Sequence, residues 1–138
     1  MIYQASRFAL GLLRRTNPRE LVRRRAENYA YLRRRIAGVA GIRFLWQEDV
    51  LPDDVCPLGL PVLVDDRWEW WRSLNAAGVK VSRWWEGYHR GLDWSEFPEA
   101  RELKDKLLLL PVHQELTTRH MEYIGAVVDS LASRSGTI

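Results

Sequence analysis

The stretch LLLLPVHQEL, residues 107–116, carries the strongest fold signal in this sequence. Four consecutive leucines predict a buried strand, and Pro111, which has no N–H to donate, is expected to end the pairing of that strand. Leu116 and Met121 have the spacing of a hydrophobic staple around Thr117, which is a good helix N-cap. The stretch therefore predicts a buried strand, a short polar connection and the last helix of the chain.

Further strand signals precede this stretch. The apolar run PLGLPVLVDD (57–66) predicts a strand that is buried on both faces, VKVSRWW (79–85) alternates as a strand does, and IRFLW (42–46) is a possible short strand. Between them, residues 67–78 suit a helix that ends at a glycine, and Pro98 marks the start of another helix. Helices and strands are thus expected to alternate over this part of the chain.

The N-terminal part reads as helical. Asn17 is the expected N-cap of a long helix, Pro18 suits its first position, and Glu20 is placed to reach back as in a capping box. Residues 2–15 predict a less regular helix before it. The long helix has one apolar stripe, which consists of Val22, Ala26, Tyr29, Leu32 and Ile36.

These elements predict a small α+β fold, an α/β sandwich, in which three or four strands are covered by helices. A chain of 138 residues is long enough for one core and too short for two. We therefore expect one domain over residues 1–138, with a helical segment at 1–40, an α+β core at 41–134 and a frayed tail at 135–138.

The composition, with 46% hydrophobic and 28% charged residues, is that of a soluble globular protein. No apolar run approaches the roughly 20 residues that cross a bilayer, and the first residues have the reverse polarity of a secretory signal, so no membrane partner and a cytoplasmic location are expected. Cys56 has no partner for a disulfide and is expected to be a buried small residue. The three histidines have no metal-site spacing, so no metal is expected.

Charge is distributed unevenly along the chain. Residues 1–43 contain eleven arginines, no lysine and only two acidic residues, Glu20 and Glu27. One interpretation is a nucleic-acid-binding module built on residues 14–35, whose affinity would fall steeply with salt. The other is a solvated or interface-facing helix, whose arginines would pair with carboxylates across a subunit or domain interface. Because strands follow this helix where a recognition helix would be needed, the second interpretation is favoured.

Candidate ligand contacts are few. His113 follows the end of a strand, where open α/β sheets place their ligand sites, and His89 follows a strand beside Trp84 and Trp85. Both histidines also have a purely structural interpretation. Seven tryptophans are far above average usage, and most are expected in the core; Trp70 and one of Trp84 and Trp85 are the expected surface candidates.

No catalytic or cofactor-binding residue emerges from the sequence. A Schiff-base lysine must be desolvated or held beside another cation. Lys104 and Lys106 lie among charged residues of an apparently exposed helix, and Lys80 points away from its apolar neighbours. A glycine-rich phosphate loop is also missing.

Five clusters, in this order, resemble the C-terminal third of nucleotide-sugar aminotransferases of the DegT/StrS type, and the likeness runs from about Ser6 to about Leu131. The clusters are Arg24, Arg25, Asn28, Tyr29 and Leu32; Pro57, Leu58, Pro61, Val62 and Val64; Gly78, Val79, Val81, Trp84, Trp85 and His89; Phe97, Pro98, Ala100 and Leu103; and Leu110, Pro111, Val112, His113, Gln114, Leu116 and Thr117.

The resemblance implies the small domain of a fold-type I aminotransferase, a largely antiparallel sheet flanked by helices. Members of the family use pyridoxal phosphate and act on sugar nucleotides in amino-sugar and surface-polysaccharide biosynthesis. Their Schiff-base lysine and phosphate-binding residues lie in a large domain that nothing in this sequence matches. The resemblance thus implies a C-terminal domain or truncated enzyme that binds no pyridoxal phosphate and is inactive alone.

The same resemblance implies partners and contacts. The expected partner is a large pyridoxal-phosphate-binding domain or a homodimer partner, and a third possibility is a subunit that docks on a separately encoded large domain. The substrate-side contacts that it implies are Trp85 and His89, with His113 near the same cleft. Without the large domain, an apolar and basic interface would be exposed, so the isolated chain is expected to self-associate.

Overall fold

The structure, a computed structural model, describes residues 6–46, 51–52 and 55–135. The expected frayed tail lies outside these residues except for Ser135, which ends the last helix. The elements follow in the order α1 (Arg7–Arg15), α2 (Pro18–Arg35), β1 (Arg43–Phe44), β2 (Gly59–Leu63), α3 (Arg67–Ala76), β3 (Ser82–Arg83), the 3-10 helix η1 (Trp94–Glu96), α4 (Pro98–Lys106), β4 (Leu107–Pro111) and α5 (Thr118–Ser135).

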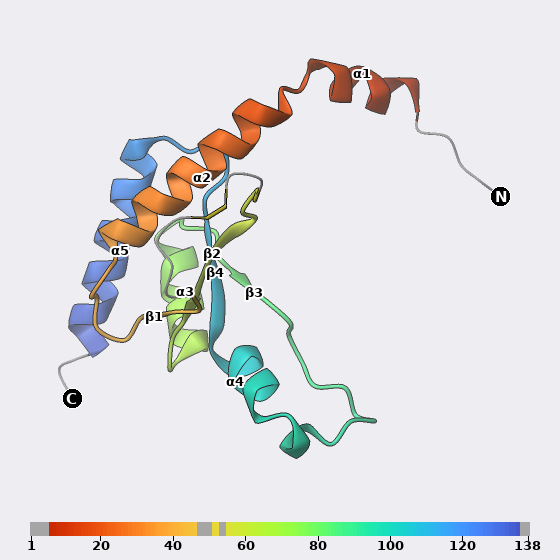
Figure 1. Ribbon diagram of the computed structural model, residues 1–138. Helices are drawn as coiled ribbons and strands as arrows, with labels where there is room; N and C mark the ends of the chain where they lie inside the picture. The colour runs from red at the N-terminus through yellow and green to blue at the C-terminus, as the bar shows by residue number, and fades with distance from the viewer. Residues whose placement is uncertain (1–5, 47–50, 53–54, 136–138) are drawn as a thin grey trace.

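The sheet has four antiparallel strands in the order β1-β2-β4-β3 (Figure 1). The leucine run forms β4, which lies between β2 and β3, so the prediction of a buried strand is confirmed. The pairing ends at Pro111 as expected, since Pro111 is the last residue of β4 and the register partner of Gly59. Its position as the last residue of the strand makes the missing N–H tolerable.

The other strands are shorter than their apolar runs. The run at 57–66 pairs only over Gly59–Leu63, and the run at 79–85 pairs only over Ser82 and Arg83. Val79 and Val81 are nevertheless buried in the core. Apolar alternation reports burial, and here burial extends beyond the hydrogen-bonded ladder.

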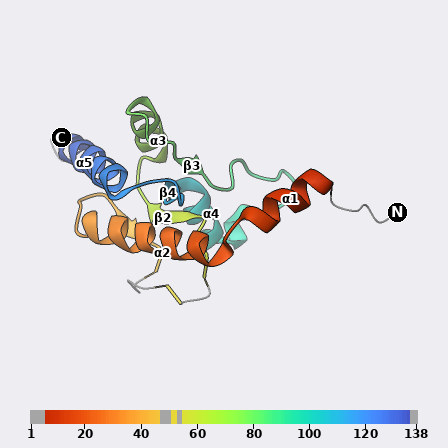
Figure 2. The same cartoon turned by 90° about the horizontal axis from the view of Figure 1, so that it is seen from above.

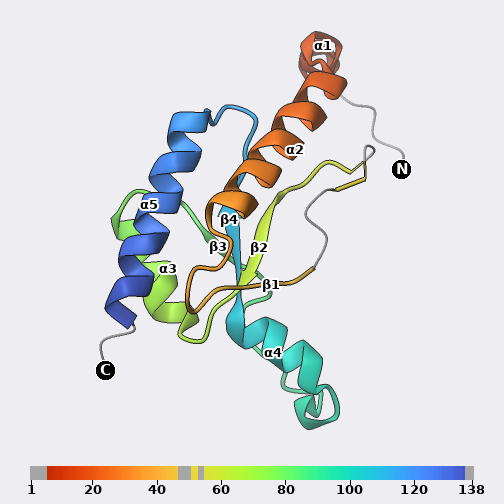
Figure 3. The same ribbon diagram turned by 60° about the vertical axis from the view of Figure 1, so that its left-hand side comes forward.

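The two faces of the sheet have different cover. Leu60 and Val62 of β2 and Leu108 and Leu110 of β4 face one side, where they pack in the main core. Figures 1 and 3 show α3 and α5 lying together on that side. Helical side chains complete the core, namely Tyr29 and Leu32 of α2 with Ile36 at its C-cap, Trp70 and Leu74 of α3, and Met121, Ile124, Val128 and Ala132 of α5.

Trp70 corrects one expectation. It was a surface candidate, but only 6% of the residue is exposed. Trp70 and Leu74 are one helical turn apart on α3, so both face the sheet, while Trp68 lies exposed on the other side of the helix. The clustering of tryptophans in the sequence did not reveal which of them faces inward.

Arg35, the last residue of α2, pairs with two carboxylates of α5. The Arg35 guanidinium donates to Glu122 Oε2 at 3.1 Å and to Asp129 Oδ2 at 2.7 Å, and the Tyr31 hydroxyl also donates to Glu122. These hydrogen bonds, from Tyr31 first and then Arg35, hold the pKa of Glu122 below its ordinary value. This contact lies within the fold, so the favoured interpretation of the basic helix, pairing across a subunit or domain interface, stays a prediction.

Helix α1 stands apart from the rest of the fold. Ser6 caps it by accepting from Ala9 N at 3.1 Å, and Thr16 and Asn17 join it to α2 in an extended conformation. Figures 1 and 2 show α1 projecting beyond the end of α2, and none of its residues is buried. Within the described part of the chain, every helix is too short or too polar to cross a bilayer.

Candidate functional site

The outer face of the sheet, opposite the helical core, carries a groove of about 710 Å³. Its floor consists of Gly59 and Pro61 of β2 and Leu107 and Leu109 of β4, which alternate with the core-facing residues. The volume lies in the usual range of ligand pockets, about 300–1,000 Å³. The walls are Tyr29, Leu45, Trp46, Leu51, Pro52, Val55, Cys56, Pro57, Leu58, Trp84 and Trp85.

The chemistry of the groove is apolar. No charged side chain lines it among the described residues, so it suits ring faces and aliphatic side chains rather than phosphates. Cys56, which was expected to be buried, is exposed on its wall. The expectation failed because Cys56 precedes the strand by three residues and therefore lies on the rim of the sheet.

One end of the groove is formed by Trp85 in an unusual backbone conformation. Its φ is +55°, in the left-handed region that bulky residues rarely adopt. The Lys104 ammonium of α4 donates to the Trp85 carbonyl at 3.0 Å and lies 4.9 Å from the Trp94 ring centre and 5.5 Å from that of Tyr88. Lys104 thus holds the backbone while the Trp85 side chain stays 55% exposed.

His89 is also held by hydrogen bonds, to its carbonyl and to its ring. Its carbonyl accepts from Trp94 Nε1 at 3.0 Å, and its Nδ1 accepts from Gly91 N at 3.1 Å. Nearby, Tyr88 donates to Asp105, and this hydrogen bond to a carboxylate raises the pKa of Tyr88. The loop between β3 and α4 is therefore anchored on α4, and the imidazole of His89 remains exposed.

His113 lies at the opposite end of the sheet. The antiparallel register directs the chain after Arg83 toward the start of β4, whereas His113 follows the end of β4. His113 lies six positions after Leu107, which corresponds to about 20 Å along a strand. The structure therefore brings Trp85 and His89 to one region and does not bring His113 to them.

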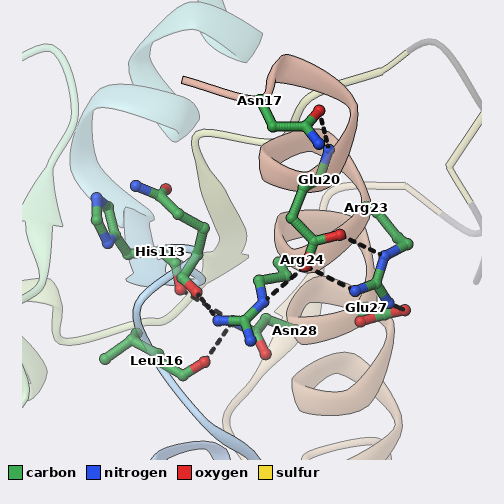
Figure 4. A network of polar contacts seen from close by, with 9 residues as sticks. Asn17, Glu20, Arg23, Arg24, Glu27, Asn28, His113 and Leu116 are labelled. Atoms are coloured by element: carbon green, nitrogen blue, oxygen red, sulfur yellow. Dashed lines mark hydrogen bonds and ion pairs between the residues drawn. The ribbon is translucent and has the colours of Figure 1, made fainter. Parts of the chain in front are cut away.

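The surroundings of His113 form a structural junction, which Figure 4 shows from close by. Asn28 is buried in α2, and its side-chain amide donates to the His113 carbonyl at 2.9 Å and to the Leu116 carbonyl at 3.1 Å. Arg24 donates to the Gln114 carbonyl at 3.2 Å, and Arg25 donates to Gln114 Oε1 at 2.8 Å. The polar triplet of the opening stretch is therefore a connection fastened to α2.

Sequence reasoning missed the role of Asn28. The signal for it was an asparagine in the middle of a helix, a position that this residue occupies poorly without a specific partner. Figure 4 also corrects the capping box: Asn17 accepts from Glu20 N at 3.3 Å as an N-cap, but the Glu20 carboxylate binds Arg23 and Arg24.

The remaining tryptophans and the lysines lie elsewhere. The Arg83 guanidinium stacks on Trp68 at 3.7 Å and on Trp71 at 4.1 Å from the ring centres. Lys106 pairs with Asp65 at 2.8 Å, and Lys80 is exposed. None of the three lysines lines the groove, and the described residues contain no group of ligands suited to a metal ion.

No protein-family model matches the sequence, and no curated protein matches it. Among solved structures, this chain is similar to the sugar aminotransferase CalS13 from Micromonospora echinospora, with a TM-score of 0.67 and 25% identity over 88% of this chain. AtS13 from Actinomadura melliaura has a TM-score of 0.71 and 26% identity over 88% of this chain. DesV from S. venezuelae, in complex with a ketimine intermediate, has a TM-score of 0.70 and 21% identity over 93% of this chain. The chain spans about a third of their length, 33%, 33% and 35% respectively. The resemblance to sugar aminotransferases seen in the sequence, and the α+β fold that it implied, are confirmed.

Proposed function

We propose that this chain, which has the fold of about a third of a sugar aminotransferase, is the C-terminal small domain or a truncated form of such an enzyme. The observation that carries the proposal is the extent of the likeness: 88% of this chain, at 25% and 26% identity, matches 33% of CalS13 and of AtS13. The ordered motifs from Arg24 to Thr117 support it. Amino-sugar or surface-polysaccharide biosynthesis in the cytoplasm is the setting that we propose.

Pyridoxal phosphate is the proposed cofactor of the complete enzyme, to which it would supply the chemistry of amino-group transfer. The residues of this chain do not fit it. The cofactor needs a lysine amine and hydrogen-bond donors or cations for its phosphate, whereas the groove has an apolar lining. Lys104 and Lys106 are engaged by Trp85 and Asp65. We therefore assign the cofactor to a large domain, in the same chain or in a separate subunit.

This assignment can be tested with the chain and with its gene. After incubation with pyridoxal phosphate and reduction with borohydride, mass spectrometry is expected to find no saturable, stoichiometric adduct on Lys80, Lys104 or Lys106. A saturable adduct on one lysine would show that an active site is present after all. Sequencing the DNA upstream of the Met1 codon is the second test. An in-frame large domain with its own lysine would support the proposal.

We further propose that Trp85 and His89 are the substrate-side contacts of this domain. An indole face stacks on a sugar ring or a base, and the backbone anchors of both residues leave their side chains exposed, although His89 Nδ1 accepts from Gly91 N. A contact from His113 would require a ligand that reaches the other end of β4. Its carbonyl and its neighbour Gln114 have structural roles, so the proposal depends on Trp85 and His89.

Substitution of Trp85 by alanine tests the contact. Titration with UDP-glucose and with dTDP-glucose is expected to change the tryptophan fluorescence of the native chain saturably, and Trp85→Ala is expected to weaken this binding at least tenfold. Trp68→Ala is the matched control, since Trp68 is also exposed but lies on the helical side of the sheet. Equal titrations of both variants, or no saturation at millimolar ligand, would count against these contacts.

A further inference from the structure

The ammonium group of Lys104 is connected to both of the residues proposed as substrate-side contacts. Figure 1 shows the chain leaving β3, running out beyond the sheet and returning to α4, and Trp85 and His89 lie on this connection. Lys104 belongs to α4 and is half-buried. Irregular connections are normally the more mobile part of a fold, so side chains that keep one orientation there need a specific anchor.

The first link runs from Lys104 to the backbone of Trp85. The ammonium donates to the Trp85 carbonyl at 3.0 Å, and the φ of Trp85 is +55°. A bulky residue is strained in the left-handed region and stays there only where its surroundings hold it. Arg67 of α3 donates to the preceding carbonyl, that of Trp84, at 3.4 Å. Two helices therefore hold consecutive carbonyls of this turn.

The second link runs from Lys104 through an aromatic ring to His89. The ammonium lies 4.9 Å from the ring centre of Trp94 and 5.5 Å from that of Tyr88, within the range of a cation–π interaction. The two rings pack edge to face, with their centres 5.1 Å apart. Trp94 Nε1 then donates to the His89 carbonyl at 3.0 Å. The cation therefore contacts the ring that holds His89.

These contacts differ from those of an ordinary surface lysine. Among the described residues, no carboxylate lies within ion-pair distance of Lys104, whereas Lys106, two positions later, pairs with Asp65 at 2.8 Å. The Lys104 ammonium contacts one carbonyl and two rings instead. A neutral side chain of similar length would keep the packing of the stem and lose both links.

We propose that Lys104 is the positioning residue of the substrate side of this domain. Its ammonium holds Trp85 and His89 in one fixed arrangement, so that a sugar nucleotide meets two side chains that are already oriented. Such preorganisation raises affinity, because the connection does not have to be ordered on binding. What the two side chains bind rests on the proposed function, whereas the arrangement itself follows from the contacts of Lys104.

Nuclear magnetic resonance of the native chain and of Lys104→Met tests the arrangement without a ligand. Methionine keeps an unbranched stem and removes the charge and the donors. The heteronuclear NOE of the backbone amides at 85 and 89 is expected to fall from values typical of the helices to those of a mobile loop. The amides of β4 are expected to stay unchanged, which shows that the fold is intact. Lys104→Arg keeps a cation and N–H donors, so it is expected to restore most of the order at both amides.

Two matched variants separate the links. Trp94→Phe keeps a ring for the ammonium and removes the indole N–H, so it is expected to loosen His89 and leave Trp85 ordered. Lys80→Met removes an exposed lysine and is expected to change neither amide. Unchanged amides at 85 and 89 in Lys104→Met overturn the proposal. So does loosening of Trp85 alone, the same loosening in Lys80→Met, or an arginine variant that behaves as the methionine variant does.

Ligand binding supplies the functional measurement. In the fluorescence titration with UDP-glucose, Lys104→Met is expected to weaken binding about fivefold, while Lys80→Met is expected to bind as the native chain does. If Lys104→Met loosens both amides and still binds at native strength, Lys104 orders the connection without positioning a contact, and the proposal fails. A native chain that does not bind UDP-glucose contradicts the proposed function, and the NOE values then decide the role of Lys104 by themselves.

Discussion

Replacing Gly59 by alanine is expected to lower the free energy of unfolding by about 2–3 kcal/mol, a loss typical of an overpacked core. A Cβ at position 59 would stand 2.4 Å from Leu109 Cγ and 2.8 Å from the Leu110 carbonyl oxygen. The carbonyl belongs to the backbone of β4, the strand that pairs with both β2 and β3. The strand cannot move away without disturbing its ladders, so the strain remains.

Gly125→Ala provides the matched control for urea unfolding. Its Cβ would stand 2.6 Å from Arg35 Cγ, which is nominally as crowded. The neighbour is the Arg35 side chain, which can shift only by loosening its pairs with Glu122 and Asp129. Alanine gains about 1 kcal/mol over glycine within a helix, which offsets that loss. We expect a change of less than about 1 kcal/mol. If both variants lose a similar amount of unfolding free energy, crowding against the β4 backbone is not the reason that position 59 requires glycine.

Replacing Asn28 by alanine is expected to cost about 2–3 kcal/mol. The side-chain amide satisfies two carbonyls, those of His113 and Leu116, at a buried position of α2. Removing the donor leaves the Leu116 carbonyl without this partner and the His113 carbonyl with only its hydrogen bond from Leu116 N at 2.9 Å, and an unsatisfied group costs about 1–3 kcal/mol before the connection relaxes. Because the connection leads directly into α5, the variant should also loosen the start of that helix.

Urea unfolding gives the stability change, and amide hydrogen exchange of Thr117 to Met121 reports on the start of α5. The control is Asn75→Ala, which also removes an amide donor, to the Trp71 carbonyl at 2.8 Å within its own helix. That carbonyl lies in α3 one turn before Asn75, so the expected loss is below about 1 kcal/mol. Faster exchange in both variants, or in neither, would contradict the proposed role of Asn28 as the fastener of α5.

These two positions explain why the motif residues stand where they do. Asn28 and His113 belong to clusters that resemble an aminotransferase domain, and the structure gives both a part in joining α2 to the connection before α5. Trp85 and His89 belong to another cluster, and their side chains remain exposed. The likeness therefore combines positions that hold the fold with positions that are open to a ligand.

Local signals in the sequence determined most of the elements. The leucine run identified β4, Asn17 and Pro18 identified the start of α2, and Thr117 identified the start of α5, because strand burial and helix capping depend on neighbouring residues. The expectation of one domain over residues 1–138 and the substrate roles of Trp85, His89 and His113 remain predictions.

The tertiary structure alone decided where distant residues meet. The pairing of Arg35 with Glu122 and Asp129, the burial of Trp70 and the left-handed backbone of Trp85 each depend on elements far apart in the chain. The groove has the same origin, since its floor consists of alternate residues of β2 and β4 that face away from the helices. Spacing along the sequence shows that a strand has two faces, but only the packing of several elements decides which face is covered and which is left open.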